Sequence, residues 1–234
     1  MEQVEAKRKS VNNFEKIEEY MDFSGSPCFY KFALIVRNKD GKTPLVQKDA
    51  LSGEMLVKEY FVDSKEYYDK VKPEMIALAD MTRARIYMTL DRKSTYKVVI
   101  SFLRKFTDML EEFMLTQKAT PKRLNKIIRH ITSSIESSER GYKTMMFDVD
   151  CDDWRVLNAI LTYVGELGVT PKIFTTVDGY HVIIPKKAYI TNDWQERAIE
   201  YARKVDNYSE EVDNLIKEVK VQPNQLELVY FKGE

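Results

Sequence analysis

The chain has 234 residues, of which 44% are hydrophobic and 32% are charged, and its formal net charge is zero. This composition is typical of a globular protein and excludes a disordered chain. It also excludes a nucleic-acid binder that relies on overall positive charge, so any such contact must come from a local basic patch.

In the first half of the chain, runs of aromatic and branched residues alternate with stretches of helical periodicity. Thr120 and Pro121 form a helix start, a cap residue followed by proline in the first turn. Helices are expected at 10–21, 64–80, 95–115 and 120–137. Strands are expected at 28–37, 55–62 and 84–90.

The second half changes character. Strands are expected at 143–149, 171–176, 180–185 and 226–231, and helices at 153–167, 193–204 and 209–219. The order strand, helix, strand, strand, helix, strand is close to the split βαβ pattern of ferredoxin-like and palm-type sheets. We therefore predict an α+β fold in a single domain, 1–234. An N-terminal mixed α/β unit with a helical insertion would occupy 1–142, and a palm-like sheet would occupy 143–234.

We expect a cytoplasmic protein, because the sequence shows no targeting signal and its cysteines suit a reducing compartment. For a viral protein this would be the host cytoplasm. No apolar run approaches the roughly 18 residues that a membrane helix needs, so we expect no membrane partner. The charged residues 1–10 lack the apolar stretch of a secretory signal. Two distant cysteines, Cys28 and Cys151, make neither a disulfide framework nor a zinc signature.

Two aspartates end the strand predicted at 143–149. Because side chains alternate along a strand, Asp148 and Asp150 point to the same face. Two buried carboxylates would repel each other, and a hard cation such as Mg²⁺ or Mn²⁺ relieves that cost. Two such ions could clamp the attacking and leaving oxygens of a phosphoryl transfer. The alternative is a solvated acidic strand end, which Asp152 and Asp153 extend into a helix N-terminus.

A lone histidine follows the tight turn expected at Asp178-Gly179. His181 can donate a hydrogen bond to a phosphate oxygen, as can Thr175 or Thr176. Gly179 would allow the backbone to approach a ligand closely. The alternative is an ordinary hairpin in which His181 is a satisfied surface or core residue.

The third acid of a metal site has two candidates. Glu227 opens the otherwise apolar strand at 226–231, and it could be a third carboxylate if that strand lies beside the strand of Asp148. Otherwise it is an exposed edge residue. Asp193 competes for the role, although its position at a predicted helix start favours a cap.

A local basic patch lies at 117–130, which contains five basic residues and no acid. On the helix expected at 120–137, Lys122, Lys126 and Arg129 share one face, and Arg123 belongs to the same segment. Such a face suits salt-sensitive contacts with nucleic-acid phosphates. The alternative is a solvated face of an amphipathic helix.

The order of these motifs resembles the archaeo-eukaryotic primase superfamily, which includes primase–polymerases. The family pattern is an apolar strand ending in D-x-D, a small-residue hairpin with a histidine, and an acid on a later apolar strand. The likeness covers about 143–231. Asp148 and Asp150 match the first motif, Gly179 and His181 the second, and Glu227 the third. The resemblance implies an RRM-like palm, in a small stand-alone member of phage or mobile-element type.

The same resemblance implies template-dependent nucleotidyl transfer, as a primase or polymerase in DNA replication or repair. Asp148, Asp150 and Glu227 would coordinate two Mg²⁺ or Mn²⁺ ions, one activating a 3′-hydroxyl and one holding the triphosphate. The implied partners are nucleoside triphosphates and a single-stranded or primed DNA template. A replicative helicase is a further candidate partner.

Phosphate contacts are implied for a second group of residues. His181, with Thr176 and Gly179, would meet the phosphates of the incoming nucleotide. Arg92 and Lys93 are candidates for further phosphate contacts, and a solvated turn is the alternative for both.

Three other functions fit parts of the pattern. The first is a catalytically degenerate palm or RRM-like protein that binds nucleic acid or a nucleotide, because Glu replaces the commoner Asp in the third motif. The second is another D-x-D enzyme, such as a nucleotide cyclase. The third is an interaction protein whose helical segment, 95–138, docks a partner.

Overall fold

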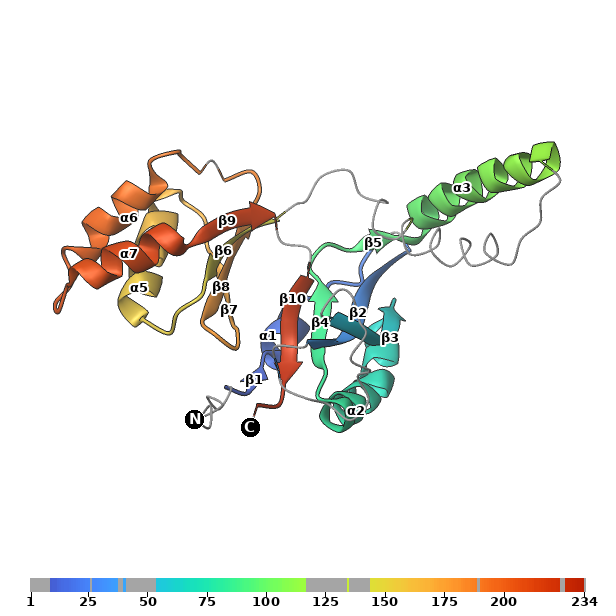
Figure 1. Cartoon of the computed structure of the whole chain (residues 1–234), viewed down its shortest axis with the longest axis horizontal. Helices are drawn as coiled ribbons and strands as arrows, with labels where there is room; N and C mark the ends of the chain where they lie inside the picture. Colours follow the sequence, from blue (N-terminus) through green and yellow to red (C-terminus); the bar gives the residue numbers. More distant parts are fainter. Residues whose placement is uncertain are drawn as a thin grey trace.

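The computed structural model describes residues 9–25, 27–37, 40, 54–116, 134, 144–188, 190–223 and 226–233. These residues form two antiparallel sheets with helices packed against them, which confirms the predicted α+β class (Figure 1). No helix in this part of the chain has both the length and the hydropathy needed to cross a bilayer.

The first sheet has the strand order β1-β10-β4-β2-β3, and β5 pairs with β2. Its strands are β1 (Val11–Asn12), β2 (Cys28–Arg37), β3 (Glu54–Val62), β4 (Arg85–Thr89), β5 (Lys93–Ser94) and β10 (Leu226–Phe231). The central strand β2 is rich in aromatic and branched residues, which suit a buried pleated surface. Strands predicted at 28–37, 55–62 and 84–90 are therefore confirmed.

Two helices pack against the core of the first sheet, α1 (Phe14–Tyr20) and α2 (Lys65–Thr82). The Ser64 hydroxyl caps α2 by accepting a hydrogen bond from the Tyr67 N–H at 3.2 Å. The helix ends at Arg83, which takes the left-handed conformation with φ 56°. Apolar side chains of α2 at helical spacing are buried in this core, among them Tyr68, Val71, Met75 and Ala79.

The second sheet has the strand order β7-β8-β6-β9. Its strands are β6 (Thr144–Val149), β7 (Lys172–Thr175), β8 (Tyr180–Pro185) and β9 (Lys220–Pro223). Its helices are α5 (Trp154–Glu166), α6 (Trp194–Ala202) and α7 (Glu210–Glu218). The first and third strands of the unit, β6 and β8, lie at its centre. The helices gather on one side of the sheet (Figure 1).

One prediction about the second sheet was wrong. Its closing strand is β9, at 220–223, and not the strand at 226–231. The latter is β10, which pairs with β4 and β1 of the first sheet. Pro223 lacks a backbone N–H to extend the ladder with β6, and the next strand, β10, belongs to the other sheet.

The two sheets share a hydrophobic core. Met146, Phe174 and Ile183 of the second sheet belong to the same cluster as Met88 and Val229 of the first. A separate cluster fills the space between the second sheet and its helices, where Phe147 and Val149 of β6 are fully buried. Because β6 alternates between these clusters, one face of the second sheet meets its helices and the other looks toward the first sheet. The proposed division at residue 142 stays a prediction.

The long helix α3 (Thr95–Thr116) extends away from both sheets (Figure 1). It confirms the helix predicted at 95–115. The helix predicted at 120–137 lies outside the described residues, apart from Ser134, and so do its four basic candidates, Lys122, Arg123, Lys126 and Arg129.

Candidate functional site

A row of side chains crosses the second sheet in register. His181 on β8 lies opposite Asp148 on β6, and Asp148 lies opposite Lys220 on β9. On the other side of β8, Phe174 on β7 lies opposite His181. Directly paired residues share a face of a sheet. Met146 precedes Asp148 by two positions and is buried in the shared core, so the row faces the first sheet.

Glu227 enters this site from the first sheet. It sits on β10 in register with Met88, and none of its side chain is exposed. The His181 Nδ1 atom lies 2.9 and 3.0 Å from the two carboxylate oxygens of Glu227. The Nε2 atom of the same ring lies 3.2 Å from Asp148 Oδ1. One imidazole therefore joins a carboxylate from each sheet, although Glu227 lies on a different sheet from the one predicted.

The two carboxylates keep His181 protonated. Burial alone would lower the pKa of His181, but the hydrogen bonds and negative charges of Asp148 and Glu227 outweigh burial and raise that pKa to about 10. At neutral pH the ring is an imidazolium that donates from both nitrogens. One positive charge is thus shared between two carboxylates, one of them fully buried.

The neighbourhood of Glu227 contains further groups that the sequence did not single out. Tyr20 on α1 packs edge-on against Phe174, with ring centroids 6.5 Å apart. Burial raises the pKa of the Tyr20 hydroxyl, and the charges of Asp91 and Glu227 raise it further. Tyr20 and the buried Asp91 therefore belong to the surroundings of the site.

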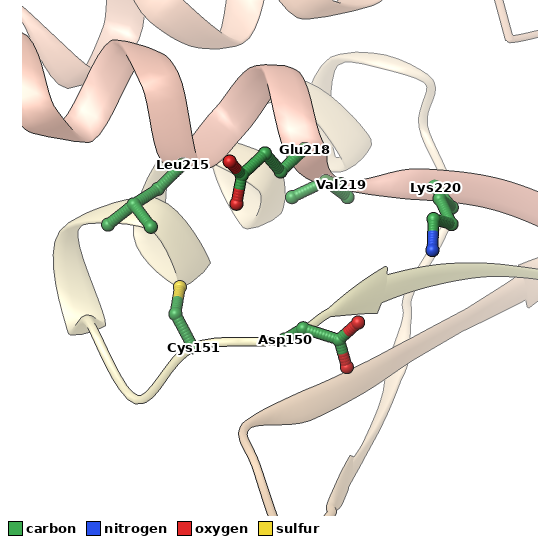
Figure 2. A pocket seen from close by; sticks show the side chains of 6 residues that line it. All are labelled: Asp150, Cys151, Leu215, Glu218, Val219 and Lys220. Carbon is green, nitrogen blue, oxygen red and sulfur yellow. The ribbon is translucent and has the colours of Figure 1, made fainter.

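Asp150 follows β6 directly and lines a hollow of about 330 Å³ beside the row. Figure 2 shows its carboxylate and the Lys220 amine at the same end of this hollow, with α7 above them. The other lining residues are Cys151, Leu215, Glu218 and Val219. Within the described part of the chain, the Lys220 side chain makes no ion pair. Lys220 is the cation that sequence reasoning missed, because only the pairing of β9 with β6 brings it beside Asp148.

Gly179 and Thr176 shape the hairpin that presents His181. A Cβ atom built on Gly179 would lie 2.1 Å from the Val149 carbonyl oxygen and 2.6 Å from that of Cys151. The glycine is therefore required for close approach to the chain's own backbone, where the sequence suggested approach to a ligand. The Thr176 hydroxyl accepts a hydrogen bond from the Gly179 N–H at 2.9 Å. Both residues hold the turn in place.

The two candidates for further phosphate contacts, Arg92 and Lys93, lie near the first sheet. Arg92 donates to the carbonyl oxygens of Asp22 and Ser24 at 3.1 and 2.7 Å and pairs with the Asp22 carboxylate. This engagement ties Arg92 to the loop before β2. Lys93 lies on the short strand β5, where its backbone pairs with Phe29. Among the contacts of the described residues, neither Arg92 nor Lys93 meets the carboxylate of Asp148 or Asp150.

Asp193, the competing third acid, stands at the N-cap position of α6. The next residue, Trp194, packs against Phe147 with ring centroids 5.1 Å apart, on the helix-covered face of the second sheet. Asp193 therefore lies on the opposite side of that sheet from Asp148. A hydrogen bond with Thr191 lowers the pKa of its carboxyl group.

The acidic groups suit a hard cation only in part. Among the residues that the structure describes, no three metal-ligating side chains gather into one group. Asp148 and Asp150 offer the carboxylates that Mg²⁺ uses together with substrate phosphates, a mode that needs only one or two protein ligands. Glu227 fits poorly as a ligand because it is fully buried and both of its oxygens face His181.

No family model, curated protein or solved structure matches this chain. The resemblance to the primase superfamily therefore stays a prediction that rests on the motifs and on the geometry described above.

Proposed function

We propose that the chain is a metal-dependent nucleotidyltransferase of primase–polymerase type, acting on nucleoside triphosphates and a single-stranded or primed DNA template. The observation that carries this proposal is the meeting of Asp148, His181 and Glu227. They come from three strands of two sheets, and His181 lies within 3.2 Å of both acids. Each of these three residues belongs to one of the three motifs on which the resemblance to the primase superfamily rests.

The topology of the second sheet supports an RRM-like palm. Its first and third strands are central, its hairpin strand β7 is on one edge, and its helices cover one face. That is the arrangement of a split βαβ unit. The side of β6 and β8 opposite the helices, which faces the first sheet, carries Asp148 and His181, and there a palm would present its reacting groups.

Asp148 and Asp150 would hold a divalent cation, Mg²⁺ or Mn²⁺, with the substrate phosphates as the remaining ligands. Such a cation, when bound, neutralises charge on the triphosphate and polarises the phosphorus centre under attack. Glu227 is assigned a different role from the one expected of a third ligand. It accepts from His181 Nδ1 and fixes the orientation of the ring, as a positioning residue.

His181 and Lys220 would bind the phosphates. The Nε2–H of His181 points at Asp148, so a phosphate oxygen that enters beside this aspartate can accept from the same edge of the ring. Lys220 approaches Asp148 from the opposite strand and has no ion pair in the described part of the chain. Phosphoryl transfer depends chiefly on position and charge neutralisation, which these groups supply.

Incorporation of labelled nucleotides in the presence of Mn²⁺ tests this proposal. Wild type should extend or begin a strand, and Asp148→Asn should reduce turnover by at least about 100-fold, since it removes a ligand charge without changing shape. Asp152→Asn is the matched control, because Asp152 is exposed and pairs only with Lys9 in the described structure. A cyclic dinucleotide as product would point to a cyclase, and no product under any condition would contradict nucleotidyl transfer.

A second candidate is a catalytically degenerate protein that binds a nucleotide or nucleic acid without turnover. It is favoured by the way His181 already pairs with both acids, together with the lack of a three-ligand group among the described residues. Such a protein should bind oligonucleotide equally well after Asp148→Asn and after chelation of divalent cations. An enzyme of the proposed kind should lose triphosphate binding under both conditions.

A further inference from the structure

The hollow beside Asp150 forms at the point where β6 and β9 part. The two strands pair as far as Asp148 and Lys220. Past that row, β6 leads into Asp150 and Cys151, whereas the chain before Lys220 is the last turn of α7. Side chains from both segments line one space of about 330 Å³, which lies at the lower end of the range for small-molecule sites.

The hollow has a polar end and an apolar end. Asp150 and Lys220 lie at the polar end, and the half-buried Leu215 and Cys151 lie at the other (Figure 2). The carboxylate of Glu218 lies between the side chains of Leu215 and Lys220, on the α7 side of the space (Figure 2). A ligand with a charged part and a less polar part therefore fits this lining in one orientation.

Glu218 supplies a hydrogen-bond acceptor to the hollow. A carboxylate accepts hydrogen bonds and cannot donate one. Within the described residues, its oxygens take part in no hydrogen bond and no ion pair. The complementary part of a ligand is therefore a hydrogen-bond donor. The two neighbouring hydroxyl groups of a ribose are such donors, and a carboxylate is the group that dinucleotide-binding folds use to hold a ribose hydroxyl.

We propose that Glu218 selects the sugar of the nucleotide, by accepting hydrogen bonds from the 2′- and 3′-hydroxyl groups of a ribose in this hollow. The inference rests on the proposed nucleotidyl transfer, in which the triphosphate lies beside Asp148, Asp150 and Lys220. The sugar follows the phosphates along the nucleotide, and the hollow adjoins Asp150 and Lys220. The base stays outside, because a template-dependent enzyme must leave the edge of the base free to pair.

This arrangement predicts a preference for ribonucleotides. A deoxyribose keeps only the 3′-hydroxyl and leaves one oxygen of Glu218 without its donor. A site built to accept from a hydroxyl group discriminates against the analogue that lacks it. Glu218 is exposed, so water replaces part of the lost hydrogen bond. We expect the preference to be at least about tenfold, the lower range for a hydrogen bond to a charged group.

Equilibrium dialysis of the full-length chain with Mn²⁺, in the absence of template, tests this inference by binding alone. The three probes are adenosine triphosphate, 2′-deoxyadenosine triphosphate and inorganic tripolyphosphate, which has neither sugar nor base. Wild type should bind all three, and it should bind the ribonucleotide at least about tenfold more tightly than the deoxyribonucleotide.

Glu218→Ala should bring the ratio of the two nucleotide affinities close to one. The ratio is compared within each protein, because removal of a negative charge strengthens the attraction of every triphosphate alike. The matched control is Glu210→Ala, which removes an exposed carboxylate from the other end of the same helix. This control should keep the wild-type ratio.

Two results overturn the inference and leave the proposed nucleotidyl transfer standing. One is equal binding of the two nucleotides by wild type, and the other is a preference that Glu218→Ala does not change. Failure of all three probes to bind overturns the inference together with the proposed function. Binding of tripolyphosphate therefore distinguishes the failure of one from the failure of both.

Discussion

The candidate site depends on His181, because its imidazole ring contacts the carboxylates of both Asp148 and Glu227. A carboxylate with no exposed surface is costly to bury unless a charged donor satisfies it. The ring supplies that donor at Nδ1. Since the other nitrogen faces Asp148, the protonation state of His181 affects both carboxylates.

Glu227→Gln should lower the pKa of His181 by at least about one unit, because it removes one of the two negative charges that raise it. The measurement is an NMR titration of the imidazole protons, which is tractable because the chain contains two histidines. His181→Asn assigns the signal. A midpoint for His181 that the Glu227→Gln change leaves in place would show that Glu227 does not hold the ring.

The raised pKa of His181 also makes stability depend on pH. The folded state keeps the proton up to a pH of about 10, whereas the unfolded chain loses it near its ordinary value of about 6.5. The stability gained from this proton is therefore complete below pH 6.5 and is lost as pH rises toward 10. Urea unfolding should show this loss in wild type and a flatter profile in Glu227→Gln. Parallel profiles for the two proteins would contradict the account.

Among the elements, the β7–β8 hairpin packs against the end of β6, and this packing aligns His181 with Asp148. Gly179 makes the close packing possible because the backbone of Val149 and Cys151 occupies the space where a side chain would begin. The Thr176 hydroxyl and the Gly179 N–H close the turn. The hairpin motif thus sets the geometry of the site through backbone packing.

Gly179→Ala should destabilise the fold by about 1–3 kcal/mol, because the added methyl group must displace backbone atoms. Gly165→Ala is the matched control, since nothing lies within 4 Å of a Cβ atom there and the residue is helical. It should leave stability unchanged or raise it by up to about 1 kcal/mol. Denaturant unfolding measures both. Equal effects at the two glycines would contradict the proposed close approach.

Much of the order of helices and strands can be predicted from the sequence, because each helix or strand is indicated by the pattern of its own residues. Periodicity within β2, β6 and α5 reflects faces that each segment buries, so the predicted bounds agree with the structure to within a few residues. The alternation rule also places Asp148 on one face of its strand. Strand partners are not local, however. Nothing within 226–231 indicates that β10 pairs with β4, or that Lys220 on a four-residue strand lies beside Asp148.

In the whole molecule, the candidate site lies between the two sheets. The shared core of Met146, Phe174 and Ile183 with the first sheet holds β10 against the second. Asn13 adds a polar link, donating to the carbonyl oxygens of Thr175 and Leu228 at 2.8 Å each. The sequence motifs single out Asp148, His181 and Glu227, and the structure brings these three side chains together. The sequence could not predict that Glu227 reaches His181 from the other sheet and is too buried to serve as an ordinary ligand.

The most direct test of the account is the binding of Mn²⁺, followed by electron paramagnetic resonance, with and without a nucleoside triphosphate. We predict that wild type binds Mn²⁺ at least tenfold more tightly when the triphosphate is present, because its phosphates supply the missing ligands. Asp148→Asn should abolish that gain, whereas Asp152→Asn should preserve it. Binding that is equally weak in wild type and Asp148→Asn, with or without the triphosphate, would contradict a metal-dependent site at Asp148 and Asp150.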